Sequence, residues 1–276
     1  SPELLQNFVN SWLAEPWEDT KLKTSADMVM ERQTDLKELI VPSWASFITG
    51  GVDVQQNCLY WSIRAWGSYI TSQNIAHGQA LSFQEVENIM NLAYRTEDGE
   101  AIVVSLCLVD SGYDTDSAYD FCASNSDWAM PVKGSSNPMM SHFKLSTINR
   151  ATSKAHGMNL VIVDTDKYKD MIASRMKKEN GKGAWMVYQG CDREYAEQVT
   201  AEHKVNIKSG SRIIQRWVQK HSHGDNHYLD CSVYEMAAAD ILGVRTLHLQ
   251  EEEPAPVEEV RETPEENWIG ANENWL

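Results

Sequence analysis

Three aspartates stand at positions where a charged side chain is costly. Asp53 lies inside the apolar run FITGGVDVQ, Asp110 ends the almost continuously apolar run AIVVSLCLVD, and Asp230 lies in the first turn of an otherwise apolar helical pattern. An ionised carboxylate that faces a core is unfavourable unless it is paired, and three carboxylates in one place repel one another. A bound divalent cation resolves both problems, so the three residues are candidate metal ligands.

The chemistry of such a site follows from its ligands. Carboxylate oxygens suit Mg²⁺ or Mn²⁺, and two such ions roughly 4 Å apart can hold the attacking and leaving oxygens of a phosphodiester. The resulting hypothesis is two-metal phosphodiester hydrolysis, with Asp53 bridging the ions and Asp110 and Asp230 holding one ion each. The alternative is that each aspartate is a separate helix cap or strand-edge residue, because the sequence does not show that the three converge.

The first half of the body is expected to form strands around these residues. Residues 47–66 contain an apolar run, the turn QQN and the alternating run LYWSIRAW, a pattern that predicts a β-hairpin. Residues 82–95 carry apolar side chains at spacings of three and four, with Ser82 and Glu85 in capping-box register, which predicts a surface helix. The apolar run at 101–110 predicts a strand that is covered on both faces.

Helix and strand patterns alternate through the second half. The expected elements are a helix through Ala123, strands at 128–134 and 158–164, a helix at 165–178, a strand at 184–188, a helix at 192–202, a strand at 212–219 and a helix at 226–242. Strands linked by helices after an opening hairpin favour an α/β fold, with a mixed sheet flanked by helices.

The composition is typical of a soluble globular protein. Of the 276 residues, 42% are hydrophobic and 23% are charged, and no run approaches the roughly 20 apolar residues of a membrane-spanning helix. The N-terminus also lacks the features of a signal peptide, so we expect no membrane partner. The five cysteines are odd in number and form no C-x-x-C pair, which favours a reduced, cytosolic setting.

The charge is uneven along the chain. The net charge of −16 argues against a nucleic-acid partner, yet residues 131–220 hold 16 basic and 8 acidic residues, whereas residues 1–130 hold 6 basic and 19 acidic residues. The basic segment could contact phosphates, for example through Lys133, Lys144 or Arg150. The alternative is that it forms ordinary solvated surface.

Several segments together resemble one family. Their combination is similar to the C-terminal nuclease domain of the large terminase subunit of tailed bacteriophages, in the lambda-like branch. The resemblance covers roughly residues 45–245 and rests on TGGVDVQQNCLYWSIRAWG, LVDSGYDTDSAYDFC, MPVKGS, VDTDKYKDMIASRM, EYAEQVTAEH and HYLDCSVYEMAAAD. It implies a ribonuclease H-like fold and a metal-dependent endonuclease that cuts concatemeric viral DNA during genome packaging. It also implies that the acidic triad of the family falls on Asp53, Asp110 and Asp230.

The resemblance further implies a domain organisation. Residues 1–45 would be a linker and the end of a missing N-terminal ATPase domain, residues 46–248 the nuclease domain, and residues 249–276 an acidic, disordered tail. The chain has no G-x-x-x-x-G-K-[ST] phosphate loop, so no ATPase activity is expected of it.

The partners that the resemblance implies are those of a packaging motor in the cytoplasm of the host cell. They are double-stranded DNA, the portal of the procapsid, and the small terminase subunit in the full-length protein. Portal docking would use the tail, where Trp268 and Trp275 would act as anchors. The alternative is that these tryptophans fold back onto the body.

Two other function classes stay open at this point. The fold could serve as a non-catalytic DNA clamp or portal-docking module, or the same triad could belong to a resolvase-like nuclease that acts on branched DNA. Metal-dependent nicking of plain plasmid would separate an enzyme from a clamp, and a preference for branched DNA would identify a resolvase.

Two further groups of polar residues allow more than one interpretation. His221, His223 and His227 near Asp225 could form a zinc cluster, but we favour a reading in which His227 or Asp225 borders the nuclease centre or caps the last helix. Asp164, together with Asp166, could extend the acidic cluster. However, VDTD before a helix is ordinary N-capping chemistry, which we favour.

Overall fold

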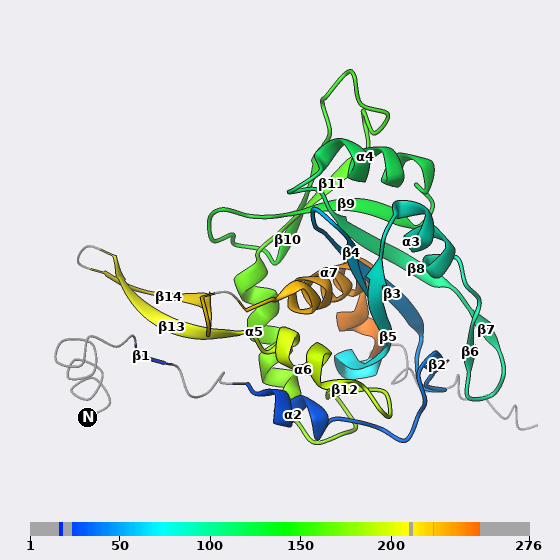
Figure 1. The fold of residues 1–276 in the computed structure, drawn as a ribbon, viewed down its shortest axis with the longest axis vertical. Helices are drawn as coiled ribbons and strands as arrows, with labels where there is room; N and C mark the ends of the chain where they lie inside the picture. Colours follow the sequence, from blue (N-terminus) through cyan, green and yellow to red (C-terminus); the bar gives the residue numbers. More distant parts are fainter. Residues whose placement is uncertain (1–16, 19–23, 210–211, 223, 249–276) are drawn as a thin grey trace, which may run out of the picture.

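The structure, a computed structural model, describes residues 17–18, 24–209, 212–222 and 224–248. Its body is built on a mixed sheet of eight strands with helices on both faces (Figure 1). In the order in which they lie side by side, the strands are β10 (Phe143–Thr147), β11 (Asn159–Val163), β9 (Ala129–Gly134), β8 (Val104–Asp110), β3 (Phe47–Val54), β4 (Leu59–Gly67), β5 (Thr71–Ala80) and β12 (Trp185–Val187).

The order of the central strands follows from how they are connected. β3, β4 and β5 form an antiparallel meander, and β8 and β9 lie parallel on the other side of β3. The helix α4 (Thr115–Ser124) makes the crossover that the parallel strands β8 and β9 require. A three-stranded meander followed by two parallel strands beside its first strand is the ribonuclease H-like strand order. The predicted fold class is therefore confirmed.

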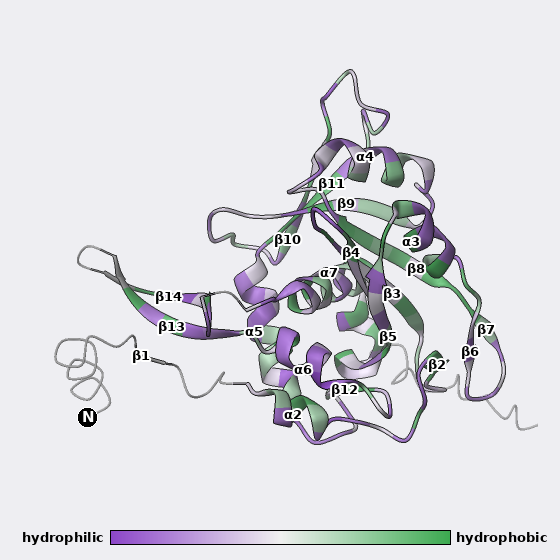
Figure 2. Ribbon diagram, in the orientation of Figure 1, coloured by the Kyte–Doolittle hydropathy of each residue, from purple (hydrophilic) through white to green (hydrophobic). Residues whose placement is uncertain are grey.

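The helices form a layer on each face of the sheet. α3 (Phe83–Met90) and α4 cover one face, and α5 (Thr165–Met176), α6 (Arg193–Val199) and α7 (His227–Ile241) cover the other. β8 feeds both cores in alternation, since Leu106 and Leu108 face the α5, α6 and α7 side while Cys107 and Val109 face the α3 and α4 side. Hydrophobic residues accordingly run along β8 and β9 in Figure 2. The prediction of a strand covered on both faces is confirmed for Val104–Asp110, whereas residues 101–102 at the start of the predicted strand pair in another sheet.

Two small sheets extend the body. β13 (Glu202–Ser209) and β14 (Arg212–Gln219) form an antiparallel hairpin that projects beyond α5, with β1 (Trp17–Glu18) paired to β13 (Figure 1). The other small sheet contains β2 (Ile40–Val41), β6 (Tyr94–Thr96) and β7 (Ala101–Ile102). The remaining short elements are α2 (Ala26–Met30), η1 (Ser68–Ile70) and η2 (Val244–Thr246).

Several predicted boundaries are wrong. The helix expected at 82–95 ends at Met90, because Tyr94–Thr96 pairs with β2 and β7 instead. Its N-terminus is as predicted, since the Ser82 hydroxyl accepts a hydrogen bond from the Glu85 backbone N–H at 3.3 Å. The strands β5, β10 and β13 were not predicted, because their polar residues give a weak alternation and the pairing with β4, β11 and β14 decides their conformation.

The segment before the hairpin packs on the body where the structure describes it. Val29 is fully buried in the core, and backbone hydrogen bonds join Thr34 to Val187 and Leu39 to Ile75. The predicted domain boundary at residue 45 stays a prediction, and the predicted acidic tail lies outside the described residues. Every helix in the described part of the chain is too short or too polar to span a bilayer.

Candidate active site

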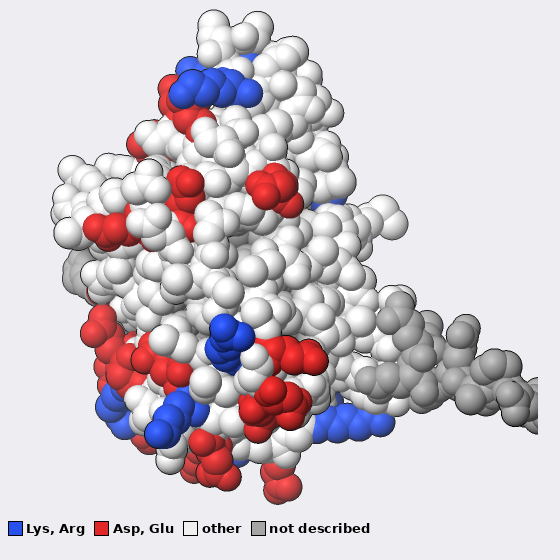
Figure 3. Space-filling model, turned by 90° about the vertical axis from the view of Figure 1, so that its right-hand side faces the viewer, with Lys and Arg blue, Asp and Glu red and all other residues white. Residues whose placement is uncertain are grey.

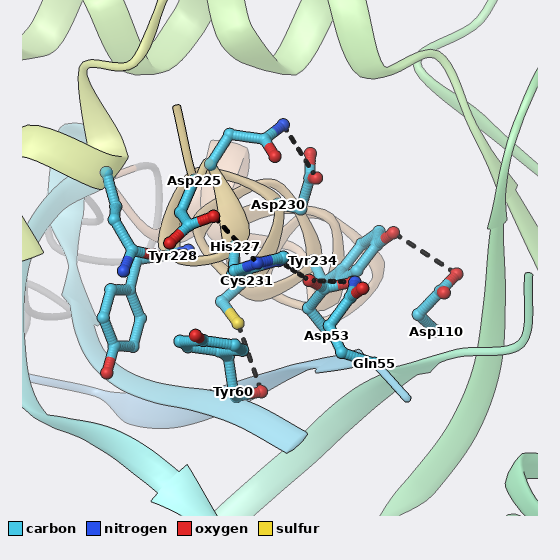
Figure 4. Close-up of polar contacts among 12 residues, drawn as sticks. Asp53, Gln55, Tyr60, Asp110, Asp225, His227, Tyr228, Asp230, Cys231 and Tyr234 are labelled. Carbon is cyan, nitrogen blue, oxygen red and sulfur yellow. Dashed lines mark hydrogen bonds and ion pairs between the residues drawn. The ribbon is translucent and has the colours of Figure 1, made fainter. Parts of the chain in front are cut away.

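Two of the three predicted aspartates lie at one edge of the central sheet. β3 and β8 are parallel, with Val52 opposite Val109, so Asp53 and Asp110 are the next residues along two neighbouring strands. Both therefore lie at the carboxyl ends of their strands, at the edge of the sheet where these strands continue into loops. Asp230 approaches from the first turn of α7, which packs across β3 (Figure 4).

A glycine allows α7 to come this close. A Cβ atom on Gly51 would lie 2.2 Å from the backbone oxygen of Cys231, so a side chain at this position would push the helix away from the strand. Thr49 adds a hydrogen bond from its hydroxyl to the backbone oxygen of Glu235 at 2.9 Å. The small residues of TGG thus bring the start of α7 next to Asp53.

A buried ion pair fixes α7 further along its length. Arg64 of β4 and Glu235 of α7 are both fully buried, and the Arg64 Nε donates to Glu235 Oε2 at 3.1 Å. The guanidinium also donates to the backbone oxygen of Met186 at 3.0 Å and lies 4.1 Å from the Trp185 ring centroid. Burial raises the pKa of Glu235, while the nearby Arg64 charge opposes that rise. This pair holds the helix in place against the sheet.

Asp53 is held by two donors. Its side chain is buried, and Oδ2 accepts from Gln55 Nε2 at 2.8 Å and contacts His227 Nδ1 at 2.8 Å. The hydrogen bond to Asp53 raises the pKa of His227, although burial opposes it. The His227 ring also stacks on Tyr60, with ring centroids 4.2 Å apart. His227 therefore borders the site, as we favoured, and the structure fixes the orientation of its ring.

Asp110 has weaker partners and a strongly shifted pKa. Its Oδ1 accepts from the Gly112 backbone N–H at 3.1 Å and from the Tyr234 hydroxyl at 3.4 Å. Burial, followed by repulsion from Asp53, raises the pKa of Asp110 to about 6. The charge of Lys133 acts in the opposite direction, which places this lysine within electrostatic range of the site.

Asp230 is surrounded by charged and polar groups. Lys169 Nζ lies 3.6 Å from Oδ1, and Asn226 Nδ2 donates to Oδ2 at 3.2 Å. Burial raises the pKa of Asp230 to about 7, with further contributions from the charges of Asp53, Glu202 and Asp110, while Lys169 lowers it. Since the aspartates perturb one another, they share one electrostatic environment.

The donor chemistry of this environment fits a divalent cation. The three aspartates contribute only oxygen atoms, and their mutual repulsion is what a cation would relieve. As they stand, no three acidic, histidine or cysteine side chains within the described residues are arranged as a ready metal site. Each aspartate instead contacts a local donor: His227, Tyr234 or Asn226.

The other predicted polar residues have separate roles. Asp164 is the N-cap residue of α5 and accepts from the Lys167 backbone N–H at 3.3 Å, which confirms the capping prediction. The N-cap position of α7 is occupied by Asn226, so capping by His227 or Asp225 is wrong. Of the histidines in the alternative zinc cluster, His221 is exposed, His223 lies outside the described residues, and His227 turns to Asp53.

Sequence reasoning missed several residues around the triad. These are Gln55, Tyr234, Asn226, Lys169 and Glu202. One of them left a trace in the sequence, because Lys169 interrupts the face of α5 that carries Ala173 and Met176 at helical spacing. A lysine on a buried helix face needs a partner, which would have predicted a nearby carboxylate.

A comparison with models of known protein families identifies the family of this chain. A family model described as "Terminase large subunit gpA, endonuclease domain" matches residues 1–251. The chain therefore belongs to the endonuclease-domain family of phage terminase large subunits, as the resemblance predicted.

Two phage terminase large subunits show low sequence identity to this chain. The chain is similar to the terminase large subunit of Enterobacteria phage P21, with 25% identity over 86% of this chain and 39% of that protein. It is also similar to the terminase large subunit of Escherichia phage lambda, with 26% identity over 86% of this chain and 38% of that protein. The chain thus spans about two fifths of the length of these relatives.

One solved structure was also found. It is described as the crystal structure of the large terminase nuclease from thermophilic phage G20c with bound magnesium. The TM-score is 0.44 with 11% identity, and the match covers 78% of this chain and 96% of that one.

Proposed function

We propose that this domain is a metal-dependent DNA endonuclease that cuts concatemeric viral DNA during genome packaging. The observation that carries the proposal is the convergence of Asp53, Asp110 and Asp230 from β3, β8 and α7 into one electrostatic environment, in a chain that belongs to a terminase endonuclease family. In this proposal Asp53, Asp110 and Asp230 would together hold Mg²⁺ or Mn²⁺ ions, with Asp53 as the ligand that would be shared between them.

The bound ions would activate a water molecule and offset the negative charge that develops on the phosphate. The residues of the chain have the complementary task of holding the carboxylates in place. Gln55 and His227 orient Asp53, while the Tyr234 hydroxyl and the Gly112 N–H orient Asp110. No covalent nucleophile is needed for hydrolysis of this kind.

DNA binding in this proposal is weak, insensitive to sequence and sensitive to salt. The face in Figure 3 shows acidic side chains beside scattered basic ones, in line with the net charge of −16. Lys133, which lies within electrostatic range of Asp110, is a candidate phosphate contact. The partners proposed for the longer protein are the small terminase subunit and the portal of the procapsid, the latter through residues 249–276.

The proposal is tested with the whole 276-residue chain. Supercoiled plasmid should be nicked or linearised with Mg²⁺ or Mn²⁺ and left intact with EDTA. A folded protein that binds DNA and leaves the plasmid uncut with either metal would be a DNA clamp instead. Cutting confined to branched DNA would identify a resolvase-like enzyme.

A further inference from the structure

A buried ion pair joins the projecting hairpin to the third aspartate. Lys169 of α5 and Glu202, the first residue of β13, are only 7% and 6% exposed. Lys169 Nζ donates to both carboxylate oxygens of Glu202 at 2.8 Å. The same Nζ atom lies 3.6 Å from Asp230 Oδ1, which is beyond hydrogen-bond distance. One buried cation thus stands between two carboxylates and is bonded to the one outside the triad.

Asn226 makes a second link between the same two carboxylates. Its Nδ2 donates to Glu202 Oε1 at 2.8 Å and to Asp230 Oδ2 at 3.2 Å. Although Asn226 is the N-cap residue of α7, its side chain makes no capping hydrogen bond. The side-chain nitrogen of Asn226 thus holds Glu202 beside Asp230.

The position of the Lys169 ammonium matters because this group could move from Glu202 to Asp230. Burial disfavours the charged form of the lysine, but the charges of Asp230 and Glu202 outweigh burial and raise the pKa of Lys169. Without the Glu202 charge, Asp230 would be the carboxylate closest to the ammonium. A lysine bonded directly to Asp230 would occupy one of its oxygens and repel a divalent cation.

We propose that Glu202 is a positioning residue of the active site, which retains the Lys169 ammonium and so leaves Asp230 free to bind a divalent cation. This inference rests on the proposed function, because it takes Asp230 as a metal ligand. Glu202 also begins β13. The base of the hairpin and the triad therefore share one network of charges.

The test is a double-mutant cycle read by metal binding. Mn²⁺ binding is measured by calorimetry for the wild-type chain, Glu202→Gln, Lys169→Met and the double variant, and thermal unfolding verifies that each protein is folded. Glu202→Gln should weaken Mn²⁺ binding about tenfold, since one neighbouring charge changes a carboxylate equilibrium by roughly that factor. Lys169→Met should bind at least as tightly as the wild type. The double variant should regain the affinity of Lys169→Met.

The outcomes separate this inference from the proposed function. Folded Glu202→Gln that binds Mn²⁺ as tightly as the wild type would overturn the positioning role while leaving the nuclease proposal intact. A double variant that binds Mn²⁺ as weakly as Glu202→Gln would also overturn the positioning role and leave the nuclease proposal intact. Removal of the lysine would not reverse a general structural role of Glu202. A wild-type chain that binds no Mn²⁺ and cuts no DNA would overturn both.

Discussion

The sheet side and the helix side of the site are built differently. Asp53 and Asp110 are positioned by backbone register, since neighbouring parallel strands bring them to the same edge. Asp230 depends on side-chain contacts of α7, through Arg64 with Glu235 and through Lys169. The sheet side should therefore tolerate changes in its surroundings, whereas the helix side should respond to substitutions at a distance.

The largest effect is expected from the carboxylates themselves. Asp53→Asn and Asp110→Asn should each lower DNA cutting by about a thousandfold or more, because each removes a ligand charge that the chemistry needs. Thermal unfolding should show that both variants remain folded, since the strands and not these side chains fix the register. A folded variant with full plasmid cutting would remove its residue from the site.

The anchor of the helix side is tested next. Arg64→Met should lower the free energy of unfolding by about 3 to 5 kcal/mol, because it leaves the fully buried Glu235 without its partner. Urea unfolding measures this change. The double variant with Arg64→Met and Glu235→Leu should recover most of the loss, since a hydrophobic pair can replace a buried ion pair. Equal stability of wild type and Arg64→Met would contradict the anchoring role.

The pKa of Asp230 gives a smaller effect with a defined sign. Its folded pKa of about 7 lies above the value of roughly 3.9 in unfolded chains, so the folded state binds this proton more tightly. The resulting stabilisation is present at low pH and is lost as pH rises through about 7. Without metal, Asp230→Asn should therefore raise stability at pH 8 by about 1 to 3 kcal/mol, and the gain should shrink toward pH 5.

The matched control is Asp225→Asn. This side chain is 65% exposed and directly precedes the N-cap residue of the same helix, so the change should alter stability by no more than about 0.5 kcal/mol at either pH. Thermal unfolding from pH 5 to pH 8 with EDTA tests both variants. A stability gain for Asp230→Asn that does not depend on pH would show that the cost of ionising Asp230 in its buried, acidic surroundings is not its cause.

The smallest effect concerns DNA binding. Lys133→Glu should weaken binding to double-stranded DNA and lower the slope of affinity against salt by about one or two ions, as loss of a phosphate contact requires. Arg150→Glu should have a smaller effect, because Arg150 is already paired with Asp116. Fluorescence anisotropy over a salt series measures both. Equal losses for the two variants would indicate a diffuse charge effect instead of a contact at Lys133.

The difference between the sheet side and the helix side also determines which parts of the site could be predicted from the sequence. Asp53 and Asp110 lie in apolar runs whose pattern predicts buried strands, and the positions of both strands were confirmed. By contrast, Lys169 and Glu202 are 33 residues apart and meet only because α5 packs beside the start of β13. No periodicity reports such a contact, and β13 itself was not predicted. The strands that carry two of the carboxylates could thus be predicted from the sequence, whereas the side chains that surround them could not.

The central claim is that Asp53, Asp110 and Asp230 form a divalent-metal centre. A crystal structure of the chain with Mn²⁺, with data collected at an energy where manganese scatters anomalously, tests it most directly. We expect anomalous peaks bounded by the three carboxylates, with His227 displaced from its contact with Asp53 if the ion takes the same oxygen. Crystals that contain Mn²⁺ elsewhere, for example at His221 and Asp225, and none between the three aspartates would contradict the account.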